Sequence, residues 1–260
     1  MTTASDILAF LDTVAPPHMQ YDWDNNGLLC GSKDKPVKKI LVALDPFEIV
    51  CREAANEGAD LLVTHHPLIF SPVKALTDDT DMGRAIMVLI QNGITAINAH
   101  TNLDCAPGGI NDVLAAKLGL SDIQIVKPQG TDPQWGLLRK GTVPAQSLSE
   151  FMNTVKKALG CQMVRYVDSG KPVHNVAVGG GSCGSDLQDA VDAGCDTFVT
   201  ADIKYNQFRN ALSQGINIID AGHFHTENPV CAVLAEKLRT KFPEIEVILS
   251  KNLTDPMKFF

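Results

Sequence analysis

Short apolar runs alternate with stretches of helical periodicity along the chain. Runs rich in Val, Ile and Leu and bounded by polar residues or Gly predict strands, whereas apolar residues recurring three and four apart predict helices. Strands buried by helices on both faces are typical of an α/β fold. We expect strands at 38–45, 59–66, 94–100, 175–181, 195–202, 216–222 and 246–250, and helices at 4–14, 47–57, 81–92, 109–118, 147–159, 185–193, 204–213 and 229–240.

The sequence contains an internal repeat. Residues 40–66 align without a gap with residues 176–202, and residues 92–100 resemble residues 214–222 in pattern and in the Gly that opens each strand. A strand–turn–helix–strand unit therefore occurs twice, although any two such units share this periodicity and a chance match is the alternative. We expect two related three-layer α/β/α halves that arose from an internal duplication.

The repeat also predicts the domain organisation. The Gly, Pro and Asp residues of segment 130–144 predict a crossing between domains. We expect residues 1–128 and 222–260 to form a first α/β domain that carries most of the candidate site, and residues 129–221 to form a second one.

Composition and charge narrow the class of protein. The 260 residues are 45% hydrophobic and 20% charged, which is ordinary for a globular protein. A net charge of −8 disfavours general binding to nucleic acid. Seven Cys residues without a CxxC pair indicate reduced thiols, and the sequence shows neither a signal peptide nor an apolar run of the roughly 18–20 residues that a membrane span needs. We therefore expect a cytoplasmic protein.

Three expected strands end in side chains of the types that commonly bind metals. The motifs are VTHHP (63–67), AHTNLD (99–104) and AGHFHTE (221–227), which hold five of the seven histidines. Ligands of open α/β sheets bind at the carboxyl ends of the strands, so these motifs are expected to meet. Imidazoles and carboxylates without a thiolate suit Zn, Fe, Mn, Co or Ni better than Ca or Mg.

The spacing within the motifs names five candidate ligands. His65 and His66 precede a proline that ends the strand, so the pair can diverge toward two ions; alternatively, one of them caps the strand end. Asp104 is either a ligand or an ordinary turn residue. His223 and Glu227 are four residues apart, so one helical turn brings both to the same side.

Four segments together resemble a known family. In this order and at these separations, WDNNGLLCG (23–31), THHPLIF (64–70), AHTNLD (99–104) and GHFHTE (222–227) are similar to the GTP cyclohydrolase I type 2 homolog family, also called the NIF-three-like or YbgI-like proteins. The resemblance covers essentially the whole chain. It implies a NIF-three-like fold and a ring-shaped homohexamer whose metal sites face the interior cavity.

The resemblance also implies a role for each candidate ligand. Two divalent metal ions are expected per chain, with His66 and Asp104 on one ion, His65 and His223 on the other, and Glu227 bridging the two. Five protein ligands for two ions, one of them shared, leave coordination positions vacant, as an enzyme requires.

Two functions of different classes follow. The first is a dinuclear metal-dependent hydrolase, with Glu227 and Asp104 as catalytic residues, because two cations about 3.5–4 Å apart lower the pKa of a shared water molecule. Its substrate would be GTP, whose purine ring water would attack, or another nucleotide or phosphoester. The alternative is a metal-binding regulatory or scaffold protein that acts through partners without turnover. Neither a membrane nor nucleic acid is an expected partner.

Five other features are less specific. His100 is expected to orient a ligand or to satisfy a strand-end carbonyl, and His225 to contact a ligand or to lie in an exposed turn. Asp202 lies either near the same site or at the N-cap of the next helix. The Gly-rich turn 178–186 either binds phosphate through its amides or packs tightly against the other half. We expect Trp23 to be buried near the site.

Overall fold

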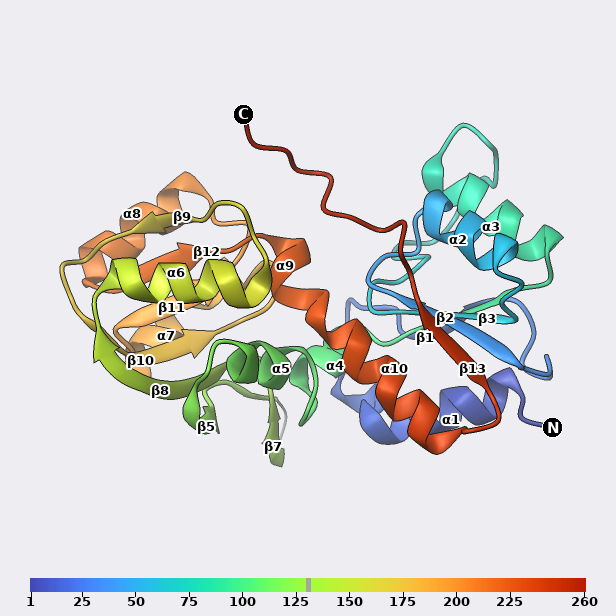
Figure 1. The fold of residues 1–260 in the computed structure, drawn as a ribbon, viewed down its shortest axis with the longest axis horizontal. Helices are drawn as coiled ribbons and strands as arrows, with labels where there is room; N and C mark the ends of the chain where they lie inside the picture. Colours follow the sequence, from blue (N-terminus) through green and yellow to red (C-terminus); the bar gives the residue numbers. More distant parts are fainter. Residues whose placement is uncertain (130–131) are drawn as a thin grey trace. The chain divides into compact units, whose positions relative to one another are not determined.

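The structure is a computed structural model that describes residues 1–129 and 132–260. The chain forms two compact units, each with its own sheet and hydrophobic core (Figure 1). Unit 1 comprises Met1–Leu103 and Val230–Thr254, and unit 2 comprises Asp104–Pro229 and Asp255–Phe260. The chain therefore passes from unit 1 to unit 2 at Asp104, a candidate ligand, and returns at Val230, three residues after Glu227, another candidate.

The sheet of unit 1 has five strands in the order β1-β4-β3-β2-β13. Strands β13, β2, β3 and β4 run parallel, and β1 pairs antiparallel with β4 at the edge. All residues of β3 and β4 are buried, because helices cover both faces of a parallel sheet. The strands are β1 (Gly27–Cys30), β2 (Lys39–Ala43), β3 (Leu61–Thr64), β4 (Thr95–Asn98) and β13 (Glu246–Leu249).

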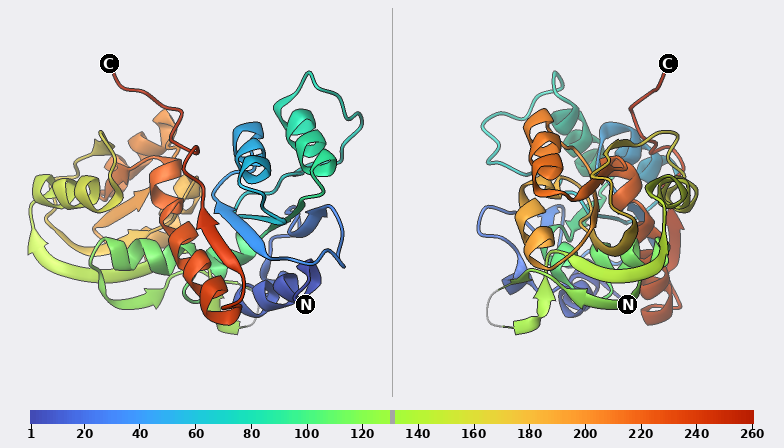
Figure 2. Two further views of the ribbon diagram at one scale, coloured as in Figure 1. Left: turned by 45° about the vertical axis from the view of Figure 1, so that its right-hand side comes forward. Right: turned by 90° about the vertical axis from the view of Figure 1, so that its left-hand side faces the viewer.

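Four helices cover the sheet of unit 1. Apolar side chains of α2 and α3, including Val50, Ala54 and Leu89, pack with Leu41 and Leu62 on one face. Helices α1 and α10 lie on the opposite side of this sheet (Figures 1 and 2). The bounds are α1 (Ala4–Val14), η1 (Pro17–Met19), α2 (Glu48–Asn56), α3 (Asp81–Gln91), α4 (Thr101–Cys105) and α10 (Pro229–Lys241).

The main sheet of unit 2 has six strands in the order β5-β8-β10-β11-β12-β9. Strands β10, β11 and β12 run parallel, while β8 and β9 pair antiparallel with β10 and β12. Strands β6 and β7 form a separate antiparallel pair. The bounds are β5 (Ser121–Ile125), β6 (Pro128–Gln129), β7 (Asp132–Gly136), β8 (Arg139–Gln146), β9 (Arg165–Val167), β10 (Val173–Val178), β11 (Thr197–Thr200) and β12 (Asn217–Asp220).

Helices cover both faces of this sheet as well. Leu114 of α5 and Phe151 of α6 pack with Val176 and Val199 on one face. Ala190 of α7 and Ala211 of α8 belong to the cluster on the other face, so unit 2 also has three layers. The bounds are α5 (Ile110–Lys117), α6 (Leu148–Leu159), η2 (Cys183–Asp186), α7 (Leu187–Asp192), α8 (Tyr205–Gln214) and α9 (His223–Glu227).

The two units share a strand order and individual hydrogen bonds. Strands β2, β3 and β4 are arranged like β10, β11 and β12. Before β3, the carboxylate of Asp60 accepts hydrogen bonds from the backbone amides of Lys38 and Lys39, at 2.8 and 3.2 Å. Before β11, Asp196 accepts from the backbone amides of His174 and Asn175, which directly precede the second copy of the repeat as Lys38 and Lys39 precede the first. The same carboxylate thus joins the first two parallel strands in each unit.

The predicted α/β fold is confirmed, and all seven expected strands and eight expected helices are present within a few residues of their expected ends. The units divide at other residues than the domains expected from the sequence, because α5 and β5 pack with the sheet of unit 2. The segment expected to cross between domains contains β7 and most of β8, and β8 pairs within the sheet of unit 2. Residues 130 and 131 of that segment lie outside the described residues.

No helix within residues 1–129 and 132–260 is both long and apolar enough to cross a membrane.

We predict that Asp60→Ala and Asp196→Ala each lower the free energy of unfolding by about 1–3 kcal/mol, because each leaves two backbone amides without their charged acceptor. Asparagine at either position keeps one acceptor oxygen and should cost less. Urea unfolding followed by circular dichroism measures the loss, with the exposed Asp34→Ala as the control. Alanine variants as stable as the control would contradict the prediction.

Candidate metal centre

Three histidines meet at the carboxyl ends of two parallel strands in unit 1. His65 and His66 directly follow β3, and His100 follows the neighbouring strand β4. One ligand atom of each lies within 4.8 Å of the others. The ring centroids are 4.8 Å apart for His65 and His66, and 5.1 and 5.5 Å from these two to His100. These residues are called the histidine cluster below.

Each imidazole of the histidine cluster is held through its Nδ1 atom. Nδ1 of His66 lies 2.6 Å from the carboxylate of Asp45, and Nδ1 of His65 lies 2.9 Å from the carbonyl oxygen of Ala99. An ionised carboxylate or a carbonyl oxygen can only accept, so Nδ1 donates its hydrogen in these bonds. The neutral ring then has its lone pair on Nε2, which is the arrangement that metal-binding histidines use.

His100 is held in the same way by a buried carboxylate. Its Nδ1 atom lies 2.8 Å from Asp24, which also accepts from the backbone amide of Thr101 at 3.0 Å and from the Thr101 hydroxyl. Burial favours the neutral carboxyl, but the hydrogen bonds from His100 and Thr101 together outweigh it and hold the pKa of Asp24 well below its ordinary value. Asp24 therefore stays ionised at neutral pH and can only accept.

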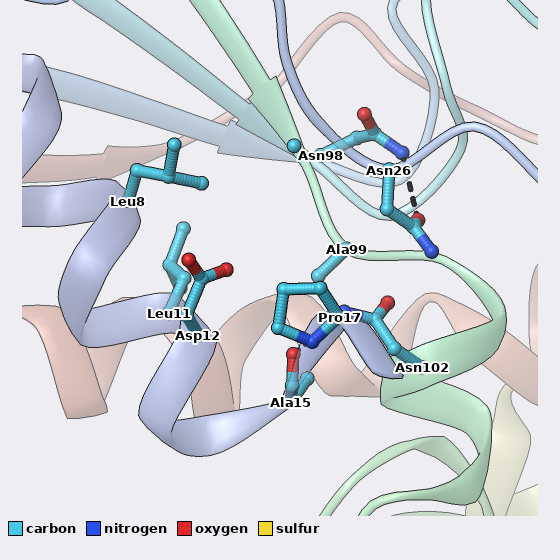
Figure 3. A pocket seen from close by; sticks show the side chains of 10 residues that line it. Leu8, Leu11, Asp12, Ala15, Pro17, Asn26, Asn98, Ala99 and Asn102 are labelled. Carbon is cyan, nitrogen blue, oxygen red and sulfur yellow. Dashed lines mark hydrogen bonds between the residues drawn. The ribbon is translucent and has the colours of Figure 1, made fainter. Parts of the chain in front are cut away.

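Amide side chains fix the backbone that leads to His100. Asn26 accepts from the His100 amide at 2.8 Å and from the side chain of Asn98 at 3.2 Å (Figure 3). Asn102 donates to the carbonyl of Ala15 at 2.6 Å. The cavity beside these residues has a volume of about 30 Å³, which is enough for one or two water molecules and too small for a substrate.

Unit 2 brings together an imidazole and two carboxylates, which we call the carboxylate cluster. Helix α9 begins at His223, directly after Gly222, and its single turn places Nε2 of His223 2.9 Å from Oε2 of Glu227. A carboxylate oxygen of Asp104 lies within 4.8 Å of one of Glu227. Asp104 and Glu227 are 8% and 4% exposed, so both carboxylates are buried.

Asp202 holds His223 as Asp45 holds His66. Its carboxylate lies 2.7 Å from Nδ1 of His223. Asp202 has a left-handed backbone conformation with a φ of 53°, which short polar residues tolerate better than most. The N-cap residue of α8 is Lys204, so the alternative that Asp202 caps this helix is wrong.

The Gly-rich turn 178–186 lies directly beside the carboxylate cluster. The amide of Gly180 donates to Asn111 at 2.7 Å, and the amide of Gly181 donates to Thr226 at 3.0 Å. Both acceptors belong to unit 2, so these two amides are not available to a phosphate, and the expected packing of the turn against the other half stays a prediction. A Cβ atom at Gly181 would clash with Oε1 of Glu227, so only glycine leaves this oxygen in place.

The donor sets of both clusters fit a divalent transition metal. Nitrogen and oxygen donors without a thiolate are those that Zn, Mn, Fe, Co and Ni accept. In the carboxylate cluster, a lone pair on Nε2 of His223 would face a carboxylate oxygen of Glu227, which is repulsive unless a proton or a cation lies between them. A bound cation removes that repulsion.

Sequence reasoning named all members of these clusters except His100, for which it expected a supporting role. It missed the anchors Asp24 and Asp45. Asp45 carried a usable signal, because it lies just beyond the carboxyl end of β2, where site residues of parallel sheets gather. Asp24 offered no such signal, since it lies in a loop far from His100 in the sequence.

Two other expectations have a structural outcome. His225 lies 3.2 Å from a carboxylate oxygen of Asp255 and 3.2 Å from the carbonyl oxygen of Leu159, so its ring is occupied within unit 2. The expectation that Trp23 is buried is wrong, because 59% of this residue is exposed. Its loop is fixed through Asp24 rather than through the indole.

Comparison with known proteins identifies the family. The family model described as Duf34/NIF3 (NGG1p interacting factor 3) matches residues 2–256. The chain belongs to this family. A DUF34/NIF3 relative from Clostridium perfringens, named GTP cyclohydrolase 1 type 2 homolog, is 36% identical over 98% of both chains. The expected membership of this family is thereby confirmed.

Solved structures support the DUF34/NIF3 fold. A Bacillus cereus protein related to NIF3 matches with a TM-score of 0.94 and 25% identity, over 100% of this chain and 99% of that one. A Staphylococcus aureus protein matches with a TM-score of 0.92 and 29% identity, over the same shares of the two chains. The predicted NIF-three-like fold is confirmed.

We predict that Gly181→Ala weakens metal binding by more than tenfold, because the added Cβ displaces the Glu227 carboxylate. Gly194→Ala is the matched control: Gly194 also has a positive φ, but nothing lies within 4 Å of its added Cβ. Both variants should lose a similar stability of about 1–2 kcal/mol from the left-handed backbone. Equilibrium dialysis with Zn²⁺ measures the affinity, and equal affinities in the two variants would contradict the prediction.

Proposed function

We propose that this DUF34/NIF3 protein is a dinuclear metal-dependent hydrolase. The observation that carries the proposal is the common anchoring of four imidazoles. Each has an acceptor on Nδ1: the carbonyl oxygen of Ala99 or the carboxylate of Asp45, Asp24 or Asp202. Fixing the tautomer and the direction of each ring costs conformational entropy. Metal-binding histidines are held in this way, so this anchoring supports a metal-binding role.

The proposed ligands are the five that the sequence named. His66 and Asp104 would hold one divalent ion, His65 and His223 a second, and Glu227 both. His100, anchored like the proposed ligands, is a candidate for a further contact. When bound, two such ions would supply Lewis acidity and lower the pKa of a water molecule. We propose Zn, Fe, Mn, Co or Ni, because the donors are imidazoles and carboxylates.

The side chains of the chain itself would do the remaining work. Asp45 and Asp202 keep the hydrogens of His66 and His223 on Nδ1, so that Nε2 can bind. The carboxylates of Asp104 and Glu227 are buried. Their negative charge would compensate a bound cation for the hydration that it loses on burial. Glu227, whose Oε1 lies where the Cβ of a larger residue than Gly181 would be, would orient the attacking water, and Asp104 would accept a proton from that water at a carboxylate oxygen.

The substrate, the assembly and the location are parts of this proposal. The name of the Clostridium perfringens relative favours GTP, and another nucleotide or a phosphoester would suit the same chemistry. We also propose a ring-shaped homohexamer, on the resemblance to the family. The seven free cysteine thiols support a cytoplasmic location, where thiols stay reduced.

The test compares the wild type with Glu227→Gln, which keeps the shape of the side chain but removes its charge. We expect the variant to lose at least the roughly 10- to 100-fold in metal affinity and turnover that loss of even an outer partner causes. Metal content by mass spectrometry and hydrolysis of GTP, other nucleotides and phosphodiesters are measured in parallel. Glu236→Gln, on the exposed face of α10, is the control.

Two outcomes would overturn the proposal. Glu227→Gln with two bound ions and full turnover would remove the assigned role of Glu227. A wild-type protein that binds two ions per chain but turns over none of the substrates would instead favour a metal-binding regulatory or scaffold protein.

A further inference from the structure

Large aromatic side chains lie exposed beside the histidine cluster in unit 1. Trp23 is 59% exposed and Phe70 is 50% exposed. The Trp23 ring stacks on Tyr21, with centroids 5.6 Å apart and planes 5° apart, and lies 5.9 Å from the Phe70 ring. Two neighbouring exposed aromatic rings are costly to leave in water, so their position calls for a function.

Both exposed rings also contact the histidine cluster. The centroid of His100 lies 6.3 Å from that of Trp23 and 6.2 Å from that of Phe70, with both rings nearly perpendicular to the imidazole. Apolar rings therefore border the candidate metal ligands directly, and a molecule that covers them has its next group beside His100.

The backbone that carries these rings is fixed. The side chain of Asn25 donates to the carbonyl of Ile69 at 2.6 Å, which ties the Trp23 loop to the Phe70 loop. Asp24, next to Trp23 in the sequence, holds His100. One hydrogen-bonded network thus sets the position of the exposed rings relative to the imidazole, as a preorganised binding surface requires.

We propose that Trp23 stacks the planar heteroaromatic ring of the substrate and that Phe70, whose ring is tilted by 50° from that of Trp23, contacts the same ring from the side; the two residues are called the aromatic platform below. This inference rests on the proposed hydrolase function, whose substrate class it narrows to compounds with such a ring, for instance nucleosides and nucleotides. Aromatic faces bind any nucleobase, because every base has a π-face. The platform discriminates against substrates that lack an aromatic ring, such as a sugar phosphate.

The charge of the protein favours a ring as the recognised group. With 30 acidic and 22 basic residues, the chain repels polyanions at long range. A stacked ring contributes affinity that does not depend on charge. A second copy of this chain is the competing occupant of the exposed rings, and the experiment distinguishes the two.

The experiment uses the intrinsic fluorescence of the two tryptophans, Trp23 and Trp135. In Trp135→Phe protein, only Trp23 emits. We expect guanosine and adenosine to quench this emission saturably, in protein loaded with Zn²⁺ or treated with a chelator, whereas ribose 5-phosphate leaves it unchanged. In Trp23→Phe protein, the emission of Trp135 should not respond.

Binding is then measured by calorimetry in variants of the platform. Trp23→Ala should raise the Kd of guanosine by at least about fivefold, and Trp23→Phe, which keeps an aromatic face, by less. Phe70→Leu should also weaken binding. Circular dichroism checks that each variant folds, and metal content should not change, so this test is separate from that of the hydrolase.

Three results would overturn the platform. The first is emission of Trp23 that no nucleoside quenches in either form of the protein. The second is a Kd that Trp23→Ala leaves unchanged. The third is Trp23 emission that iodide cannot quench while the protein is oligomeric, because a second copy of the chain would then cover the rings.

Discussion

The site depends on one chemical constraint: an imidazole binds a cation only through a nitrogen that carries no hydrogen. In this protein the hydrogen of each cluster histidine is held on Nδ1 by an acceptor that cannot itself donate. The acceptors are the Ala99 carbonyl and the carboxylates of Asp24, Asp45 and Asp202. Three features place these acceptors. They are the loops at the strand ends, the left-handed backbone of Asp202 and the hydrogen bonds around Asn26.

The repeated strand order explains how two different clusters arise from similar units. A five-residue helix follows the third parallel strand of each unit along the chain, α4 after β4 and α9 after β12. The sequence repeat pairs His66, a proposed ligand, with Asp202, which anchors a histidine in the other unit. The repeat thus pairs a histidine of the histidine cluster in unit 1 with a carboxylate that anchors the imidazole of the carboxylate cluster in unit 2.

Sequence patterns predict the parts of this fold that depend on burial. The apolar runs of β3 and β11 are buried over their whole length, so hydrophobicity alone locates them. Strands β5 and β9 were missed because most of their residues are exposed, and α4 and α9 because five residues give no helical period. Motifs named the candidate ligands, and one motif also contains Asp24, but the bond from Asp24 to His100 joins distant segments and no local pattern encodes it.

Asp24 links the proposed metal binding at the histidine cluster to the proposed stacking of a ring on Trp23. Its buried carboxylate orients His100, and the same loop presents Trp23. Since its hydrogen bonds keep Asp24 ionised despite burial, the network is held by charge and is rigid where it meets the imidazole. On the two proposals above, bound cations and stacking of the base would together hold a nucleotide, and Asp24 would set the distance between these two contributions.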